Sequence, residues 1–258
     1  MTLKQLYARP GRTVVTAHRG WSGRYPENTL CAFREAVGIG ADVVEFDVRG
    51  TADGELVVIH DESLDRTTDG TGPVRERTLA ELKPLNATFW RGPHDTGYRS
   101  ATPAGDESIP TLRETLSALA GRVGMNVQVY TADRDALRTI VGLFTEFRLH
   151  DSAFLMLNSF GEADYVRRLD PRVPVCTGED RADVEKQLRR RMDFLQPAYG
   201  DLTEEYVARA RAAGARVNVF YANTAERARL LVDAGIPGIL TDCPDVVILA
   251  AGPGRPRS

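Results

Sequence analysis

The sequence predicts an α/β protein, a (β/α)₈ TIM barrel that forms one domain over residues 1–250 with a small insertion at about 62–110. Three observations lead to this fold class. Short β-branched runs alternate with amphipathic helices, eight of these runs are predicted to pair in parallel, and a closed barrel satisfies all their edges. The length of 258 residues suits one such domain. A doubly wound open sheet is the alternative, but no G-x-G-x-x-G follows the first strand.

The eight predicted barrel strands follow one another in chain order. They are Thr13–Ala17, Val43–Val48, Asn126–Tyr130, Ala153–Asn158, Val173–Cys176, Phe194–Pro197, Arg216–Tyr221 and Gly238–Thr241. The helices predicted between them include Asn28–Gly38, Arg134–Phe147, Glu204–Ala213 and Ala225–Ala234. Gly214 and Gly235 are placed to end the last two of these helices.

One further strand, Leu56–His60, follows Val43–Val48 too closely for a crossover. The connection contains Asp-Gly, a strong signal for a hairpin turn. If paired residue numbers sum to about 105, Glu45 lies opposite His60, and opposed residues are roughly 4.5–5.5 Å apart. The sequence therefore predicts an antiparallel hairpin after the second barrel strand.

Two segments lie outside the barrel pattern. Residues 62–110 are predicted to form an irregular insertion with one short helix near Leu79–Leu85. The tail 251–258 is rich in Gly, Pro and Arg, and we expect it to be disordered.

The composition limits the partners and the location of the protein. A net charge of −3 argues against nucleic acid, and the basic run Arg189–Arg191 is interpreted as a solvated helix face. The three cysteines have neither zinc-site spacing nor a disulfide pattern. No apolar run approaches the ~20 residues of a membrane span, and Met1–Arg12 lacks a signal-peptide core. We therefore expect a cytoplasmic protein; the sequence carries no signal for an oligomeric state.

Three charged clusters fall where predicted strands end. They are His18-Arg19-Gly20, Glu45-Phe46-Asp47 and His60-Asp61. Because barrel enzymes keep their sites at the C-terminal mouth, we expect these clusters to converge. Glu45 and Asp47 are two residues apart on a strand, so both carboxylates point to one face. Two buried carboxylates repel each other unless a cation lies between them, although salt bridges to Arg19 and Arg49 are the alternative.

Two of the four histidines, His18 and His60, end apolar strands. A single histidine at a strand end is more often structural. Two of them beside a carboxylate pair supply an acid, a base and a cation site, and we expect their imidazoles to face each other across the cation. His94 and His150 lie in loop-like contexts, and we assign no role to them.

At the level of motifs, the chain resembles the glycerophosphodiester phosphodiesterase family. The motifs that carry the resemblance are Ala17-His18-Arg19-Gly20, Tyr25-Pro26-Glu27-Asn28-Thr29, Glu45-Phe46-Asp47-Val48, His60-Asp61-x-x-Leu64-x-Arg66-Thr67-Thr68, Ile109-Pro110-Thr111-Leu112, Asn158-Ser159-Phe160 and Gly238-Ile239-Leu240-Thr241-Asp242 with Pro244. The similarity runs from about residue 14 to 247, and the motifs around the two histidines and the carboxylates are highly specific together.

The resemblance implies metal-assisted hydrolysis of phosphodiesters such as glycerophosphocholine to glycerol 3-phosphate and an alcohol. It implies that His18 and His60 are the general acid and base, and that Glu45 and Asp47 bind a divalent cation, usually Mg²⁺ or Ca²⁺. Arg19 is expected to contact the phosphate. The full set expected at the substrate is Arg19, Asn28, Tyr130 and Phe220.

The chain departs from the family pattern on the third barrel strand. Where the family has a glutamate and a lysine two residues apart, this sequence has Gln128 and Tyr130. Gln128 can offer a carbonyl oxygen as a third metal ligand but no charge, so we expect weaker metal binding. Tyr130 can donate a hydrogen bond to phosphate without a permanent charge.

Three interpretations of this departure stay open. They are an active hydrolase, an enzyme with an altered substrate or a phosphodiester-transfer reaction, and a non-catalytic phosphate-binding barrel. A smaller departure is Phe220, where the family usually has tryptophan. Phe220 is expected either to wall the alcohol pocket or simply to pack in the core.

Overall fold

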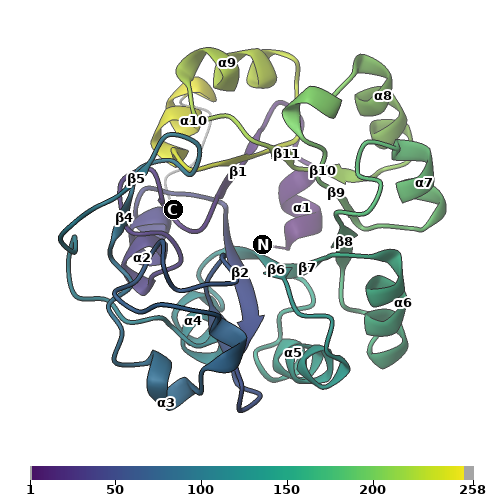
Figure 1. Ribbon diagram of the computed structural model, residues 1–258. Coiled ribbons are helices and arrows are strands. Elements are labelled where there is room, and N and C mark those ends of the chain that lie inside the picture. The colour runs from purple at the N-terminus through teal and green to yellow at the C-terminus, as the bar shows by residue number, and fades with distance from the viewer. Residues whose placement is uncertain (1, 253–258) are drawn as a thin grey trace.

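Strands form a ring at the centre of the molecule and helices enclose it, as Figure 1 shows. This computed structural model describes residues 2–252. The ring consists of β1 (Val14–Ala17), β2 (Val43–Gly50), β6 (Gly124–Val129), β7 (Ala153–Leu157), β8 (Val175–Thr177), β9 (Phe194–Leu195), β10 (Arg216–Val217), β11 (Val219–Phe220) and β12 (Gly238–Thr241). The predicted TIM-barrel fold class is confirmed.

Parallel pairing runs around the ring in the order β11-β12-β1-β2-β6-β7-β8, and β9 pairs with β10. Single backbone hydrogen bonds connect these two sheets. The N–H of Asp193 donates to the oxygen of Val175 at 2.9 Å, and that of Phe220 donates to Pro197 at 3.0 Å. The predicted strand Arg216–Tyr221 is divided into β10 and β11 at Asn218, whose N–H donates to Leu195.

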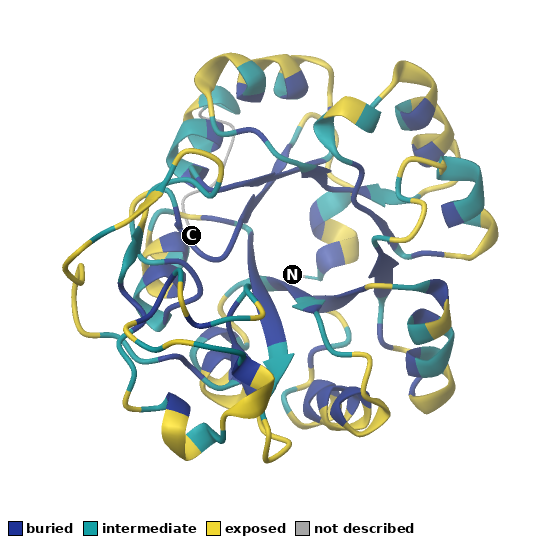
Figure 2. Cartoon of the chain, viewed as in Figure 1, coloured by how far each residue is buried: buried dark blue, intermediate teal, exposed yellow. Residues whose placement is uncertain are grey.

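The helices lie outside the ring, and Figure 2 shows their buried faces turned toward the strands. They are α2 (Leu30–Gly38), α4 (Leu112–Leu119), α5 (Arg134–Glu146), α6 (Phe160–Leu169), α7 (Val184–Arg189), α8 (Glu204–Ala212), α9 (Ala225–Asp233) and α10 (Pro244–Ala250). Side-chain oxygens at the N-caps accept backbone hydrogen bonds in most of them, as Thr29 does before α2. Helix α2 begins two residues later than predicted, because Asn28 has a φ of 56° and Thr29 is the cap. Among the described residues, no helix has both the length and the apolar character that crossing a membrane requires.

Helix α1 (Leu3–Tyr7), which the sequence analysis did not predict, closes the N-terminal end of the barrel. Its buried residues Leu3 and Leu6 belong to an apolar cluster made with strand residues. The other members of that cluster are Val14, Val43, Phe154, Met156, Cys176 and Phe194. This end of the barrel is therefore a packed core, which leaves the opposite end for the site.

Truncating one buried side chain of helix α1 tests how much this helix contributes to the stability of the fold. We expect Leu6→Ala to lower the free energy of unfolding by about 2–5 kcal/mol, because the removed side chain leaves a cavity under the barrel. Urea unfolding followed by circular dichroism measures the effect. Leu249→Ala is the matched control, since that side chain is 79% exposed. Equal urea midpoints for the two variants would contradict a stabilising role for helix α1 at this end of the barrel.

The predicted hairpin is present, but its predicted register is wrong by one residue. Strand β3 (Leu56–Val58) pairs antiparallel with β2, with Val48 opposite Val58, so paired numbers sum to 106. Glu45 is therefore not opposite His60. The reason lies in packing, because Leu56 and Val58 join the main core while Val57 and Ile59 join a separate cluster beneath the insertion. A shift of one residue would exchange these two faces.

The insertion has more structure than predicted. Besides the short helix α3 (Leu79–Leu82), it contains a 3₁₀ turn, η1 (Val74–Glu76), and a small hairpin of β4 (Trp90–Arg91) and β5 (Tyr98–Arg99). Its apolar side chains pack on β3, in a cluster made of Val57, Ile59, Leu64, Val74, Leu82, Ala87 and Ile109. This packing supports the proposal that residues 1–250 form one domain.

At the C-terminus, the N–H groups of Ala251 and Gly252 donate to the last turn of α10. The first two residues of the tail expected to be disordered therefore cap a helix. The rest of that tail, 253–258, lies outside the described residues.

Candidate active site

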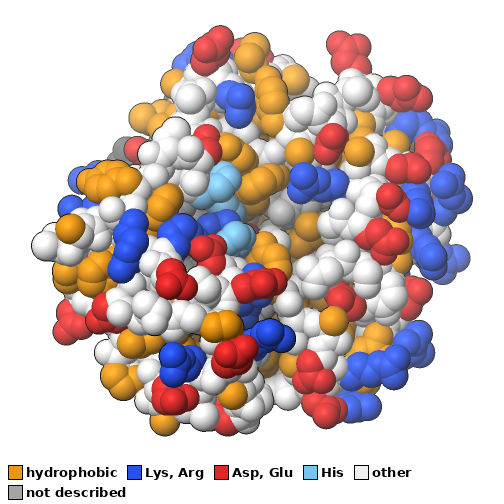
Figure 3. Space-filling model, in the orientation of Figure 1, with side chains coloured by type: hydrophobic (Ala, Val, Ile, Leu, Met, Phe, Trp, Pro, Cys, Tyr) orange, Lys and Arg blue, Asp and Glu red, His pale blue; other side chains and the backbone are white. Residues whose placement is uncertain are grey.

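The charged side chains that the sequence analysis grouped at strand ends lie at one face of the barrel. Figure 3 shows histidine, basic and acidic side chains gathered near the centre of that face. β1 leads into His18 and Arg19, and β2 carries Glu45 and Asp47. This is the end of the barrel opposite the α1 plug.

Glu45 and Asp47 lie side by side on β2 and are almost completely buried. Glu45 Oε2 accepts the backbone N–H of Arg19 at 2.8 Å, and Asp47 Oδ2 accepts the amide Nδ2 of Asn28 at 2.8 Å. Burial, with the nearby charge of Asp47, raises the pKa of Glu45 well above its ordinary value. Glu45 Oε1 and Asp47 Oδ1 have no hydrogen-bond partner within residues 2–252. Two buried carboxylate oxygens without partners fit a hard cation.

Arg19 belongs to a network of charged groups that includes Asp47. Its Nη1 donates to Glu27 Oε1 at 2.8 Å, and its Nε lies 3.2 Å from Asp47 Oδ2. Glu27 also accepts two hydrogen bonds from Arg66, at 2.7 and 2.8 Å. The sequence analysis gave Glu27 and Arg66 no role, although both stand in its quoted motifs. Arg19 thus contacts Asp47, as the salt-bridge alternative expected, while Arg49 donates to the backbone of His60 instead.

Glu27 is the group in this network for which a pH effect can be predicted. Burial opposes its ionisation, but Arg19 and Arg66 lower its pKa to about 2 from the ordinary 4.5. A lowered pKa stabilises the folded state above pH 4.5, and that stabilisation is lost as the pH falls toward 2.

We expect Glu27→Gln to lower the free energy of unfolding at pH 7 by about 3 kcal/mol, because two arginines lose their shared carboxylate. The difference from the wild type is expected to shrink when unfolding is measured at pH 3. Urea titrations at both pH values check this. A difference that stays constant would show that the ionisation of Glu27 does not stabilise the fold.

His18 is held by a carboxylate that directly follows the last barrel strand, β12. Its Nδ1 lies 2.6 Å from Asp242 Oδ1, and its Nε2 faces Glu45 Oε2 at 3.9 Å. Burial, followed by the charge of Arg19, lowers the pKa of His18. Phe220 contacts the ring edge-on, with centroids 5.3 Å apart, so it lies at the site rather than only in the core. Asp242 was quoted in a motif, but the sequence analysis did not assign it a role.

His60 has a carboxylate partner of its own. Its Nδ1 lies 2.7 Å from Asp61 Oδ1, and its ring contacts Tyr130 edge-on at 5.3 Å. Gln128 Nε2 donates to the hydroxyl of Tyr130 at 2.6 Å, and Gln128 is in register with Asp47 on the neighbouring strand. Contacts therefore run from His60 through Tyr130 to Gln128, which lies beside Asp47 in the strand register.

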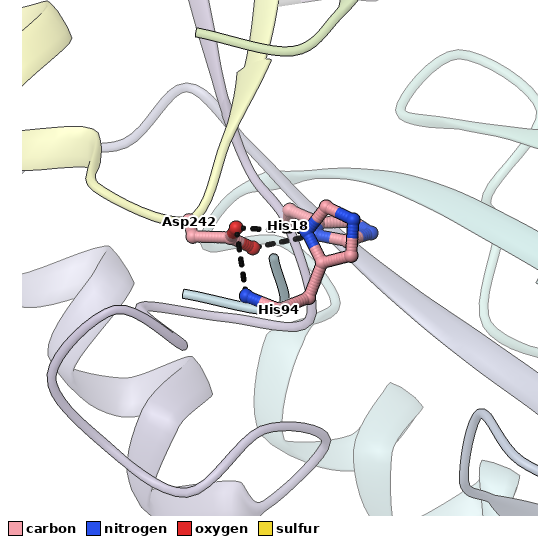
Figure 4. Close-up of side chains that lie close together, drawn as sticks. All are labelled: His18, His94 and Asp242. Atoms are coloured by element: carbon pink, nitrogen blue, oxygen red, sulfur yellow. Dashed lines mark hydrogen bonds and ion pairs between the residues drawn. The ribbon is translucent and has the colours of Figure 1, made fainter. Parts of the chain in front are cut away.

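A third histidine, His94, reaches the site from the insertion. Its Nδ1 lies 3.1 Å from Asp242 Oδ2. Figure 4 shows the His94 side chain beside Asp242 and His18. Ligand atoms of His18, His94 and Asp242 lie within 4.8 Å of one another, close enough for a metal ion. However, both oxygens of Asp242 already accept hydrogen bonds, from Ser22 and Asn223 as well as from the histidines. The unpartnered oxygens of Glu45 and Asp47 are the better candidate for a cation.

The geometry limits what this site can do. An arginine beside buried carboxylates suits an anionic substrate with a cation, and two imidazoles held by carboxylates suit proton transfer. Together, the barrel and this mouth define a hydrolase of phosphate esters.

Comparison with known proteins agrees with this class. The model of the Glycerophosphoryl diester phosphodiesterase family matches residues 18–246. A glycerophosphodiester phosphodiesterase of Caldanaerobacter subterraneus is 32% identical over 92% of this chain and 97% of its own length. A Bacillus altitudinis enzyme of that name is 30% identical over 90% of this chain and 96% of its own.

Solved structures give the same result. A glycerophosphodiester phosphodiesterase of Agrobacterium tumefaciens superimposes with a TM-score of 0.77 at 26% identity, over 93% of this chain and 100% of that one. An Oleispira antarctica phosphodiesterase, in complex with the product sn-glycerol-3-phosphate, has a TM-score of 0.73 at 27% identity, over 92% and 95%.

The chain belongs to the Glycerophosphoryl diester phosphodiesterase family. It is a phosphoric diester hydrolase that acts on glycerophosphodiesters, as the motifs predicted. The alternative of a non-catalytic phosphate-binding barrel is therefore set aside. Members of the family generally depend on a divalent metal ion.

Proposed function

We propose that this site hydrolyses glycerophosphodiesters to glycerol 3-phosphate and an alcohol, with His18 and His60 as the proton-transferring groups. The observation that carries the proposal is the placement of His18. Asp242 occupies its Nδ1, and its Nε2 is turned toward the buried carboxylates. The glycerol 3-phosphate bound to the Oleispira antarctica relative supports this product.

For the cation, we propose Glu45 and Asp47 as ligands and Gln128 as the third. The amide nitrogen of Gln128 is used by Tyr130, which leaves its carbonyl oxygen for a cation. Oxygen ligands of this kind suit Mg²⁺ or Ca²⁺. When bound, such an ion supplies charge neutralisation to the phosphate oxygens.

The side chains of this chain do the remaining work. With Nδ1–H donated to Asp242, His18 presents a lone pair on Nε2, and its lowered pKa keeps it neutral, so it suits the base that takes the proton of the attacking hydroxyl. His60, oriented by Asp61, then suits the acid that gives a proton to the leaving alkoxide. The guanidinium of Arg19 is proposed to hold a phosphate oxygen.

The other expected substrate residues have separate roles in this proposal. Tyr130, beside His60, is proposed to donate a hydrogen bond to the phosphate. Phe220, against His18, is proposed to wall the alcohol pocket. Asn28 was expected at the substrate, but its amide is bound to Asp47, so we propose that it orients this metal ligand.

Assaying the release of glycerol 3-phosphate from a panel of glycerophosphodiesters, with and without EDTA, tests the proposal. We expect turnover of at least one diester with Mg²⁺ or Ca²⁺ and loss of turnover in EDTA. Absence of turnover across the panel with either ion would contradict the proposed function. Full turnover in EDTA would contradict the assignment of a catalytic metal ion. A cytoplasmic location stays a prediction.

A further inference from the structure

The proposed reaction gives no role to His94, although its imidazole lies at the mouth of the barrel. It lies between β4 and β5 at the tip of the small hairpin in the insertion. Figure 4 shows its ring next to that of His18, with Asp242 beside both. The two ring centroids are 5.4 Å apart. A residue of the insertion thus stands directly beside the proposed base.

The hairpin tip is fixed to the barrel by several hydrogen bonds. The backbone N–H of His94 donates to Asp242 Oδ2 at 3.2 Å, in addition to the contact of its ring. The next residue, Asp95, accepts the hydroxyl of Tyr221 at 2.9 Å. Gly97 closes the hairpin, since a Cβ there would lie 2.6 Å from the oxygen of Arg91. The position of the His94 ring is therefore set by the fold.

The contact with Asp242 also determines which nitrogen of His94 faces a ligand. Hydrogen bonds from both histidines lower the pKa of Asp242, although burial opposes this, so it stays an ionised acceptor. An ionised acceptor at Nδ1 holds a proton on that nitrogen, so the neutral ring of His94 has its lone pair on Nε2. In the described part of the chain, His94 Nε2 has no hydrogen-bond partner.

The surroundings of His94 suit a small polar group. Its side chain is 26% exposed, whereas that of Asp242 is fully buried, so a ligand in the mouth can reach the ring. Phe220 and Tyr221 lie against it, with centroids 5.8 and 4.7 Å away. Small-molecule sites combine aromatic side chains with a few polar groups that fix the orientation of the ligand.

We propose that His94 Nε2 accepts a hydrogen bond from a free hydroxyl of the substrate's glycerol group. His94 is then a residue that selects for phosphodiesters with a hydroxyl near the phosphate. The inference rests on the proposed function, because it assumes that the phosphate lies beside His18. Since the ring centroids of His18 and His94 are 5.4 Å apart, a short polyol attached to that phosphate can reach the neighbouring imidazole.

Two unreactive ligands that differ in their hydroxyl groups test the inference by binding alone. The affinities of glycerol 3-phosphate and n-propyl phosphate are measured by calorimetry with Mg²⁺ present, for the wild type and for His94→Ala. We expect the wild type to bind glycerol 3-phosphate about tenfold more tightly, and His94→Ala to reduce this ratio to about one to threefold. n-Propyl phosphate is expected to bind both proteins alike.

Tyr98→Ala is the matched control, since Tyr98 is 60% exposed on the same hairpin, and it should leave the ratio unchanged. An unchanged ratio in His94→Ala, or a wild type that does not distinguish the ligands, overturns the inference. An equal loss of affinity for both ligands leaves the ratio unchanged, and it would mean that His94 acts on the phosphate through Asp242 and His18. Turnover of glycerophosphodiesters tests the proposed function separately.

Discussion

Replacing His18 by alanine is expected to lower kcat by about 10²–10⁴-fold, the range typical for loss of a general acid or base. The ring lies between Asp242 and Glu45, and no other described side chain combines an Nδ1 fixed by Asp242 with an Nε2 turned toward Glu45. His60→Ala is expected to cause a loss of similar size. Steady-state release of glycerol 3-phosphate measures both.

A matched control for these variants is His150→Ala. His150 also pairs with a carboxylate, Asp170 at 3.0 Å, but it contacts none of the site residues. This variant is expected to keep its kcat within about twofold, in contrast to the acid–base losses. If His18→Ala and His60→Ala both keep full turnover, the assignment of the two histidines fails.

Gln128→Glu is expected to tighten the binding of Mg²⁺ or Ca²⁺ by about tenfold or more, because the third ligand gains a negative charge. Without a cation, the same variant should unfold at a lower temperature. A third carboxylate would then face Glu45 and Asp47, of which Glu45 already has a raised pKa through burial and repulsion. Calorimetric titration and thermal unfolding with and without the ion measure the two effects.

Asp47→Asn is the counterpart of this variant, since it removes one charge from the same face of the site. It is expected to weaken cation binding by about tenfold or more. Equal affinities for the wild type and Gln128→Glu would show that Gln128 is not a ligand. If Asp47→Asn also leaves the affinity unchanged, the cation binds elsewhere, and the cluster of His18, His94 and Asp242 is the next candidate.

The barrel and most residues of the site could be predicted from local patterns. The alternation of strands and helices is repeated in short windows, and the chemistry-bearing residues follow directly after β-branched runs. Glu45 and Asp47 lie on one face because a strand has a period of two, which needs no knowledge of the rest of the chain.

The same reasoning predicted the wrong register for the hairpin. The Asp-Gly turn predicted the hairpin, but pairing numbers around that turn gave a sum of 105 and placed Glu45 opposite His60. The observed sum is 106. Packing made the difference, because Val57 and Ile59 are covered by the insertion while Leu56 and Val58 face the main core. The sequence around the turn carries no information about what covers each face.

By itself, the sequence determined that eight strands alternate with helices and that two histidines, an arginine and two carboxylates lie at or near the ends of strands. Only the tertiary structure decided the partner of each group. Asp242 holds His18 across 224 residues of sequence, and the same carboxylate binds His94 across 148. The physical reason is that secondary structure depends on neighbours within a few residues. Contacts between distant segments arise only when the barrel closes and its buried charges must find partners.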